Sequence, residues 1–386
     1  MLLHHLSLRE FRNFAAAEVD FGARFTVLHG PNGAGKTNIL EALYLVATLR
    51  SFRAADLGPL IRHDATEARV EVRGHDQRLD VGTRLAVHLT RTGRQTRRQA
   101  LADGKTVRSG PDFYGRLRAI LFTPEDLAVL RGSPTGRRQF LDRALFARDR
   151  AHLADIADYE KLLRSRNRVL RGEDAGIPKA QQDALLDAYD AGLAASGARI
   201  WLRRERLLTD LRAAFAETFA QIHGRHLEVS LTYASKLGVP AGDDPQAVLL
   251  DALRAARRHD LVRGTTTVGP HRDDFEVRLD GQGAADFASQ GQARALILAF
   301  KIAELQDARA RSGEAPILLL DDVSSELDPQ RSAQLFAALL REAGQCVLTT
   351  TAPHFIGLPA GGDCRYIEVE RGRLKTAGAS GGDSGA

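Results

Sequence analysis

The feature that most constrains this chain is the segment GPNGAGKT at residues 30–37, which fits the pattern G-x-x-x-x-G-K-[ST]. Residues 24–29 before it are β-branched and apolar and predict a short strand. Residues 38–46 after it carry apolar side chains at helical spacing. A strand, a glycine loop and a helix in this order form a phosphate cradle, which predicts that the chain binds a nucleoside triphosphate.

Each residue of the loop has an expected part in this cradle. Glycines let backbone N–H groups converge on anionic oxygens. Lys36 is expected to reach the β- and γ-phosphates and to act in catalysis, and the Thr37 hydroxyl is expected to ligate Mg²⁺. The predicted nucleotide-binding residues of the loop are Gly30, Pro31, Asn32, Gly33, Ala34, Gly35, Lys36 and Thr37.

A second cluster, at residues 315–322, is an apolar run that ends in Asp321 and Asp322. Consecutive apolar residues without alternation predict a strand buried on both faces of a parallel sheet, and such sheets bind ligands beyond the carboxyl ends of their strands. Asp321 fits the Mg²⁺-side carboxylate of a Walker B strand. Asp322 is placed to orient or activate the attacking water. Taken alone, the pair could also be two solvated carboxylates.

The third element is the sequence S-x-G-Q, in which Ser289, Gly291 and Gln292 precede a helical stretch at 293–304. Serine before a helix is a good N-cap, so a plain capping role stays open. The order of phosphate loop, S-x-G-Q, Walker B and residues 325–328 resembles the ABC-type ATPase head. In such heads the S-x-G-Q segment of one subunit caps the γ-phosphate bound to the other, so these three residues are expected to contact the nucleotide of a second copy.

Within that class the chain resembles the RecF family of SMC-like ATPases. Residues 6–14 are similar to the opening strand and turn of SMC-like repair ATPases, which implies nucleotide contacts for Arg12 and Asn13. Residues 122–127, 132–142 and 269–274 are similar to RecF segments, and the match runs in order from residue 2 to about 355. Individually, residues 269–274 could be a turn before the strand 275–279, and Arg137 with Arg138 could be a helix entry.

The resemblance implies an ATP-dependent DNA-binding protein of recombinational repair and replication. Such a protein would dimerise on ATP and clamp gapped DNA or junctions between duplex and single strand. The family also implies a part in the response to DNA damage, cooperation with RecR and RecO, and promotion of RecA assembly. No individual residue indicates these protein partners.

Three departures from the wider ABC pattern bear on catalysis. Asp322 is one methylene shorter than the commoner glutamate, threonines at 349–351 replace the switch histidine, and residues 122–127 contain no glutamine to sense Mg²⁺. We therefore expect a weak, DNA-stimulated ATPase in which ATP acts mainly as a dimerising ligand.

Basic residues are concentrated between positions 84 and 108, where Asp103 is the single acid. The alternation predicts an antiparallel strand pair at 85–89 and 98–101 with a turn at 103–104. Arginines on such a pair could follow a phosphate backbone, or could keep a β-edge soluble. The candidate DNA-binding residues are Arg91, Arg94, Arg97 and Arg98.

Composition restricts the remaining classes. No apolar run of 18 residues exists and the N-terminus lacks a basic region before an apolar core, so no membrane association and a cytoplasmic location are expected. The two cysteines, Cys346 and Cys364, make no disulfide framework, and no spacing resembles a zinc site.

The predicted fold is an α/β ABC-type ATPase head, a mixed sheet with a P-loop, plus a smaller helical lobe inserted between Walker A and the signature motif. The expected divisions are the N-terminal head at 1–136, the helical lobe at 137–264, the C-terminal head at 265–370 and a disordered tail at 371–386. In the lobe, helix-spaced apolar residues predict two helices, broken near 172–178, that pair as an antiparallel hairpin.

Two other functions share part of these motifs. The ATPase subunit of a membrane transporter would have the phosphate loop and an S-x-G-Q-like element, but residues 9–14 and the missing switch histidine argue against it. A non-hydrolysing DNA-binding scaffold that keeps a nucleotide site is the second alternative.

Overall fold

The computed structural model describes residues 1–76, 80–93, 95–108, 110–173, 178–223, 227–238, 243–322, 342–351 and 364–376. The chain divides into two compact units, one of Met1–Asp126 with Glu304–Ala386 and one of Leu127–Ala303. The divisions fall at 126/127 and 303/304, whereas the sequence suggested 136/137 and 264/265. The later division moves because β10 (Asp274–Leu279) contacts α4 and Phe300 of α9 (Gln290–Ser312) packs against Phe140 of α4.

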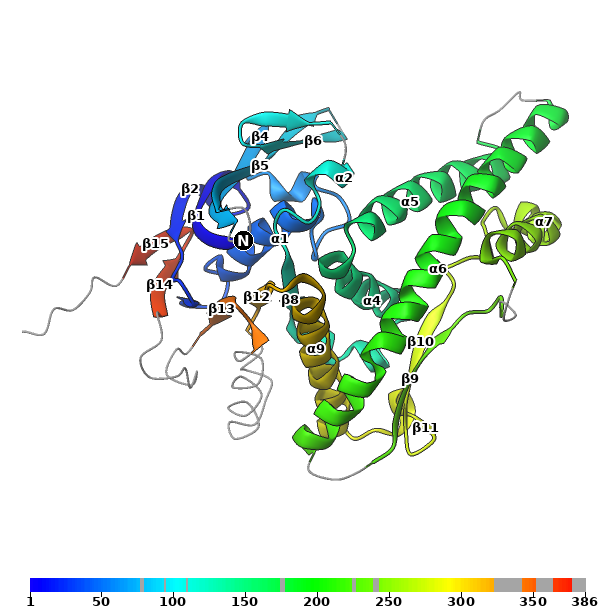
Figure 1. Ribbon diagram of the computed structural model, residues 1–386. Coiled ribbons are helices and arrows are strands. Elements are labelled where there is room, and N and C mark those ends of the chain that lie inside the picture. Colours follow the sequence, from blue (N-terminus) through cyan, green and yellow to red (C-terminus); the bar gives the residue numbers. More distant parts are fainter. Residues whose placement is uncertain are drawn as a thin grey trace, which may run out of the picture. The chain divides into compact units, whose positions relative to one another are not determined.

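The first unit contains a mixed sheet that is parallel apart from one edge strand (Figure 1). Its order is β15 (Arg373–Thr376), β14 (Cys364–Glu370), β3 (Phe25–His29), β13 (Gln345–Thr350), β12 (Ile317–Leu320) and β8 (Ala119–Phe122). All residues of β8, β12 and β13 are buried, and for β12 the unbroken apolar run predicted this. The expected Walker B strand and the strand before the phosphate loop are both confirmed.

The second sheet of this unit is antiparallel. Its order is β2 (Phe14–Asp20), β1 (Leu2–Phe11), β4 (Glu67–Asp76), β5 (Val81–Thr92), β6 (Gln95–Ala102) and β7 (Lys105–Val107). The predicted pairing of 85–89 with 98–101 is confirmed, and the turn at Asp103 and Gly104, both at positive φ, joins β6 to β7. The 3-10 turn η1 (Gly58–Leu60) and the short helix α2 (Gly110–Phe113) connect the strands of this unit.

Helix α1 (Lys36–Thr48) forms the centre of the first unit. It contacts β8 and β13 of the mixed sheet and β4 and β5 of the antiparallel sheet. Its side chains from Ile39 to Thr48 are all buried, which suits a helix enclosed between two sheets. Burial of each Leu or Ile side chain stabilises the folded state by roughly 1.5–3 kcal/mol. This helix therefore holds the two sheets and the preceding loop in place.

The second unit is mainly helical. Its elements are η2 (Val129–Arg131), α4 (Pro134–Arg148), α5 (Arg150–Leu170), α6 (Lys179–His223), β9 (Val229–Ala234), α7 (Pro245–Arg263), β10, β11 (Gln282–Gly283), α8 (Ala284–Phe287) and the first part of α9, while α3 (Pro124–Leu127) lies across the boundary. Figure 1 shows α5 and α6 running side by side, and the two helices pack against each other as the predicted hairpin. Phe140, Phe275 and Phe300 form an aromatic cluster with ring centroids 4.9–6.4 Å apart.

Two expectations, one in each unit, were wrong in detail. The first predicted helix is two helices, because Asp149 has an extended backbone and its side chain caps α5 by accepting from the Ala151 N–H. The tail expected from residue 371 includes β15, which pairs with β14 around a turn at Arg371 and Gly372. Residues 377–386 lie outside the described ranges.

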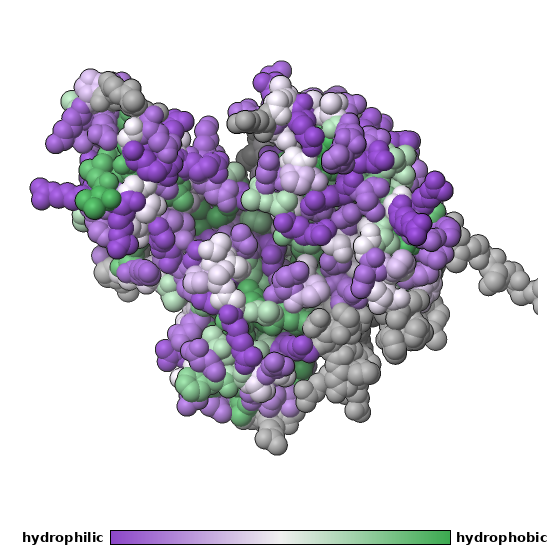
Figure 2. Space-filling model, turned by 180° about the vertical axis from the view of Figure 1, so that it is seen from behind, coloured by the Kyte–Doolittle hydropathy of each residue, from purple (hydrophilic) through white to green (hydrophobic). Residues whose placement is uncertain are grey.

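Polar residues cover most of the face shown in Figure 2, with apolar colour confined to small areas. Among the described residues, large exposed apolar side chains are scattered, with Val262 and Phe287 the most exposed. Within those same residues, none of the helices combines the length and the apolar character needed to cross a bilayer.

Candidate functional site

The phosphate loop joins β3 to α1 at the carboxyl edge of the mixed sheet, and two of its glycines are required by geometry. Gly30 has φ 145°, and a Cβ there would stand 2.1 Å from the carbonyl oxygen of Val369 in β14. Gly35 has φ 117°, and a Cβ there would meet the Asn13 side chain at 2.6 Å. A side chain at either position would strain the backbone and displace a neighbour, so the loop needs glycine.

Lys36 lies inside this loop. Its Nζ donates to the carbonyl oxygens of Gly30 at 2.7 Å and Pro31 at 3.0 Å, and only 6% of the residue is exposed. Burial lowers the pKa of the Lys36 ammonium, and the charges of Asp322 and Asp321 oppose that effect. The cation is thus held where oxygens of an anionic ligand could replace the loop carbonyls as its partners.

The predicted metal ligands meet at the end of β12. Thr37 Oγ1 donates to Asp321 Oδ1 at 2.7 Å, and Thr349 Oγ1 from β13 donates to the same oxygen at 2.8 Å. Burial raises the pKa of the Asp321 carboxyl, while these two hydrogen bonds lower it and the nearby Glu125 raises it further. A desolvated carboxylate beside a threonine hydroxyl suits Mg²⁺, which keeps few protein ligands and takes phosphate oxygens as well.

No group of three or more His, Cys, Asp or Glu side chains is arranged to hold a metal ion in the part of the chain that the structure describes. A cation site complete without phosphate is therefore not formed by these residues. The donor set at Thr37 and Asp321 fits a cation bound together with a nucleotide.

Asp322 follows with its backbone in the left-handed region, at φ 38°. Its N–H donates to Thr349 Oγ1 at 2.9 Å, so one threonine hydroxyl connects both carboxylate residues. Asp322 and Lys36 line the same cavity of about 270 Å³. The other lining residues are Asn32, Gly33, Ala34, Gly35, Thr37, Asn38, Arg53 and Thr349.

Three of these residues, Asn38, Thr349 and Arg53, were not assigned by sequence. The threonines at 349–351 were noticed only as a replacement for the switch histidine, and the buried strand placed Thr349 beside β12. Arg53 lies in the loop after α1 and donates from Nη1 to Asn38 Oδ1 at 3.0 Å. No pattern in the sequence marks Arg53, because the loop brings it to the cavity only through tertiary structure.

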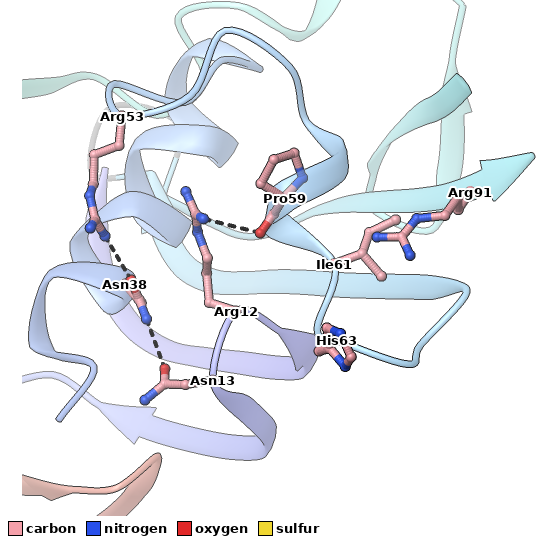
Figure 3. A pocket seen from close by; sticks show the side chains of 8 residues that line it. All are labelled: Arg12, Asn13, Asn38, Arg53, Pro59, Ile61, His63 and Arg91. Carbon is pink, nitrogen blue, oxygen red and sulfur yellow. Dashed lines mark hydrogen bonds between the residues drawn. The ribbon is translucent and has the colours of Figure 1, made fainter. Parts of the chain in front are cut away.

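A second cavity of about 480 Å³ adjoins the first and shares Asn38 and Arg53 with it. Figure 3 shows its lining, in which Asn38 bonds both Arg53 and Asn13. The lining residues are Arg12, Asn13, Asn38, Arg53, Pro59, Ile61, His63 and Arg91. This cavity has room beside the phosphate loop for the nucleoside part of a ligand.

Arg12 and Asn13, the predicted contacts from the N-terminal turn, support this wall. Arg12 pairs with the fully buried Glu41 of α1 at 2.7 Å and donates to the Pro59 carbonyl at 3.1 Å. Asn13 Nδ2 donates to the carbonyl of Ala34 at 2.8 Å and so braces the phosphate loop directly. The turn and the loop are therefore joined before any ligand binds.

The candidate DNA-binding arginines that the structure describes do not share one surface. Arg91 lines the second cavity and donates to the Gly58 carbonyl, and Arg98 donates to the Leu49 carbonyl at the end of α1. Arg97 is exposed on the opposite face of the sheet, opposite Thr90. Arg94 lies outside the described residues, as do residues 325–328.

The S-x-G-Q segment begins α9 in the second unit. Ser289 Oγ accepts from the Gln292 N–H at 3.2 Å, and Gln292 Oε1 accepts from the Ser289 N–H at 2.8 Å. This reciprocal pair is a capping box, so the capping role is present. Ser289 is exposed and Gly291 half-buried, which leaves the N-terminal end of the helix accessible.

Residues 269–274, whose role the sequence left open, hold the second unit together. Arg204 of α6 pairs with Asp142 of α4 at 2.8 Å and donates to the Pro270 carbonyl at 2.7 Å. Arg137 makes a bidentate pair with Asp274. Tyr159 Oη bonds His271 Nδ1 at 2.7 Å. The segment thus connects α4, α5 and α6 to β10.

Comparison with known proteins places the chain among DNA-repair ATPases. The model of the RecF/RecN/SMC N-terminal domain family matches residues 2–357. The DNA replication and repair protein RecF of Myxococcus xanthus (strain DK1622) is 40% identical over 391 residues, covering 97% of each chain. RecF of Anaeromyxobacter sp. (strain Fw109-5) is 42% identical over 379 residues, covering 97% of this chain and 99% of its own.

Solved structures agree with this. A structure of the recombination mediator protein RecF with ATP, in the RecFOR pathway, has a TM-score of 0.83 and 26% identity, covering 97% of each chain. An SMC head bound to the C-terminal winged-helix domain of ScpA has a TM-score of 0.53 at 16% identity, which is a likeness of fold alone. The predicted ABC-type head is confirmed by these neighbours.

Proposed function

This chain belongs to the RecF family of SMC-like, ABC-type ATPases, and we propose that it is an ATP-dependent DNA-binding protein of recombinational repair and replication. In this proposal the protein works in the cytoplasm, where two copies close around ATP and hold gapped DNA or a junction between duplex and single strand. RecR and RecO would be its partners, since a structural relative is described as a mediator in the RecFOR pathway. Assistance to RecA assembly completes the proposal.

The observation that carries the nucleotide part is the meeting of Lys36, Thr37 and Asp321 at one end of the sheet. The buried cation and the hydroxyl line one cavity, the desolvated carboxylate of Asp321 accepts a hydrogen bond from that hydroxyl, and the loop admits only glycine at Gly30 and Gly35. This set matches the charges of a triphosphate and its cation. A relative of the same fold has been solved with ATP.

The residues would divide the work as follows. Lys36 and the backbone N–H groups of the loop bind phosphate oxygens, and Thr37 with Asp321 holds Mg²⁺, which neutralises charge on the phosphates when bound. Asp322 orients the attacking water. Thr349 fixes both carboxylate residues through its hydroxyl.

Slow hydrolysis is part of this proposal. Asp322 is shorter than glutamate, and its left-handed backbone is fixed by the Thr349 bond, so its carboxylate has little freedom to adjust to a water. A slow ATPase stays in the dimeric state for longer, which suits a switch rather than a motor. Asp322→Asn should reduce turnover further and prolong the dimer; unchanged turnover would remove Asp322 from catalysis.

Ser289 would complete the site from the other copy. Its exposed position at the start of α9 gives it a hydroxyl and a helix dipole to present to a γ-phosphate. The experiment is the mass of the protein in solution with and without ATP and Mg²⁺, by light scattering. A dimer that forms only with ATP supports the proposal, and a monomer at saturating ATP overturns it.

The capping box makes a matched control necessary. Ser289→Ala removes an N-cap as well as the proposed contact, whereas Ser133→Ala removes only the N-cap of α4, which accepts from the Gly136 N–H at 3.1 Å. ATP-dependent dimerisation should be lost in the first variant and kept in the second. Equal behaviour of the two variants would mean that Ser289 serves only as a cap.

A further inference from the structure

The outer face of the antiparallel sheet carries a group of arginines that has no part in the nucleotide site. Strand pleating puts Val70 and Val72 of β4 and Leu85 and Val87 of β5 on the inner face, where each is fully buried. The alternate positions therefore point outward. Those of β4, β5 and β6 include Arg69, Arg73, Arg84 and Arg97, which we call the outer arginine patch.

Three members of the patch surround Glu71. Its carboxylate lies 2.6 Å from Arg69, 3.2 Å from Arg73 and 2.6 Å from Arg84. Burial alone would raise the pKa of Glu71, but hydrogen bonds from these arginines lower it to about 2. One carboxylate therefore offsets repulsion between Arg73 and Arg84, which stand directly opposite each other in the strand register.

The arrangement keeps positive charge on the surface. Glu71 is 4% exposed, while the side chains of Arg69, Arg73 and Arg84 are 45%, 59% and 48% exposed. Arg97 is exposed one strand further along, opposite Thr90, and Glu67 is the other carboxylate on this part of the face. The patch therefore has four guanidinium groups and only two carboxylates nearby, and one of these, Glu71, is covered by its arginine partners.

Acidic residues on the same face of the sheet lie to one side of the patch. Toward β2, Glu18 and Asp20 are engaged by His5, and Arg9 pairs with Glu18 at 3.4 Å. The acids thus gather at the β1–β2 side and the unbalanced arginines at β4–β6. A polyanion would meet attraction only over β4, β5 and β6.

The chemistry of the patch selects one kind of polyanion. Guanidinium groups on a rigid sheet suit repeated phosphates, because each offers several donors in a fixed plane. Strands β4, β5 and β6 contain no Phe, Tyr or Trp in the residues that the structure describes, so stacking of unpaired bases is not provided. We propose that the outer arginine patch binds the phosphate backbone of duplex DNA without reading its sequence.

This inference rests on the proposed DNA-binding function and gives it a surface. It separates Arg97 from Arg91 and Arg98, which the sequence grouped together. Arg91 and Arg98 face the nucleotide cavity and α1, so their substitution should disturb the ATP-binding unit rather than DNA contacts.

The test compares DNA affinity of Arg73→Ala/Arg97→Ala with the wild type, for a labelled blunt duplex and a single strand of equal length, with ATP present. Arg69 and Arg84 still hold Glu71 in this variant. Duplex affinity should fall roughly tenfold at low salt. The negative slope of log affinity against log salt should become shallower by about two. The matched control is Arg206→Ala/Arg278→Ala, which removes two exposed arginines near carboxylates in the second unit.

Each outcome has a distinct meaning. A wild type that binds neither the duplex nor the single strand overturns the proposed DNA-binding function itself, and one that binds only the single strand overturns the patch. If the wild type binds duplex and the patch variant binds it as tightly as the wild type or the control variant does, only the patch is overturned. The same holds if the patch variant loses affinity for the single strand alone. Arg97→Glu leaves the Glu71 cluster intact, so it should also weaken duplex binding while ATP affinity is kept. Arg73→Lys/Arg97→Lys, which keeps the charges, should retain most of the affinity.

Discussion

The hydroxyl of Thr37 donates a 2.7 Å hydrogen bond to Asp321, which lies 284 positions later in the chain. The two residues come from the two motifs that sequence patterns identify most clearly. Their contact exists because β3 and β12 lie on either side of β13 in one parallel sheet, so the segments that follow them meet at the same edge.

Replacement of Lys36 by alanine should weaken ATP binding about 100-fold or more. The loop would lose a charged donor, and hydrogen bonds to charged groups are worth roughly 1.5–3 kcal/mol each. Isothermal titration with ATP measures this. Lys375→Ala, which removes an exposed lysine of β15, should leave the affinity unchanged; equal affinity in the Lys36 variant would refute the cradle.

Replacement of Thr349 by valine should weaken Mg²⁺-dependent ATP binding and slow hydrolysis. Valine keeps the shape but leaves the Asp322 N–H without its acceptor and removes a donor to Asp321, at a cost of about 1–3 kcal/mol. Thr349→Ser keeps the hydroxyl and should retain most of the activity. If serine and valine behave alike, the hydroxyl has no positioning role.

Alanine at Gly35 should harm nucleotide binding more than alanine at Gly33. Both glycines have positive φ, so each variant carries a strain of about 1–2 kcal/mol. Only at Gly35 does the new Cβ also collide with Asn13, whereas nothing lies within 4 Å at Gly33. Nucleotide affinity and thermal unfolding of the two variants should therefore differ, and identical values would contradict the close approach of the turn.

Arg166→Met should destabilise the second unit by about 3–5 kcal/mol, because Asp260 would lose its buried cation and Asp190 would keep only the partly exposed Arg257. The side chains of Arg166 and of both carboxylates have no exposed surface. Arg171→Met is the control, since Arg171 pairs with an exposed Glu173 just past the end of the same helix, and such pairs contribute at most about 1 kcal/mol. The free energy of unfolding of both variants is measured in urea. Similar decreases in the two variants would mean that the buried cluster adds little to stability.

The second unit should lose stability in weak acid through His271. Burial and the charges of Arg272 and Arg138 lower its pKa to about 4, against the opposing bond to the Thr266 carbonyl. The unfolded chain takes up this proton near pH 6.5 and the folded chain only near 4, so stability declines as pH falls between these values. The loss is at most roughly 3 kcal/mol.

His271→Gln isolates this contribution. Unfolding free energies at pH 7 and pH 4.5 should differ less in the variant than in the wild type, whatever its stability at pH 7. The buried carboxylates such as Asp142 titrate in both proteins and cancel in the comparison. An equal decline in the two proteins would remove His271 as the cause.

Local patterns were sufficient for much of the nucleotide site. The glycine loop, the strand before it and the apolar run ending in Asp321 are each specified within a few residues, and all three formed as predicted. The failures were of a different kind. One long periodic run was predicted as a single helix, and only the extended backbone at Asp149 divides it into α4 and α5.

The arginines between positions 84 and 108 show the limit of local patterns most clearly. Sequence grouped Arg91, Arg97 and Arg98 by nearness and charge, but strand pleating sends Arg97 to one face of the sheet and the other two to the opposite face. A one-residue shift in strand register would exchange these faces, and register depends on pairing with β4 and α1 packing beneath.

By itself, the sequence determined that a phosphate-binding loop and a Walker B strand exist, because backbone conformation and burial at those positions depend on adjacent residues. Tertiary structure alone decided which distant groups join them. Thr349, Arg53 and Arg91 reach the cavities, and Glu71 collects its three arginines, through sheet order, strand register and loop paths that no short pattern encodes.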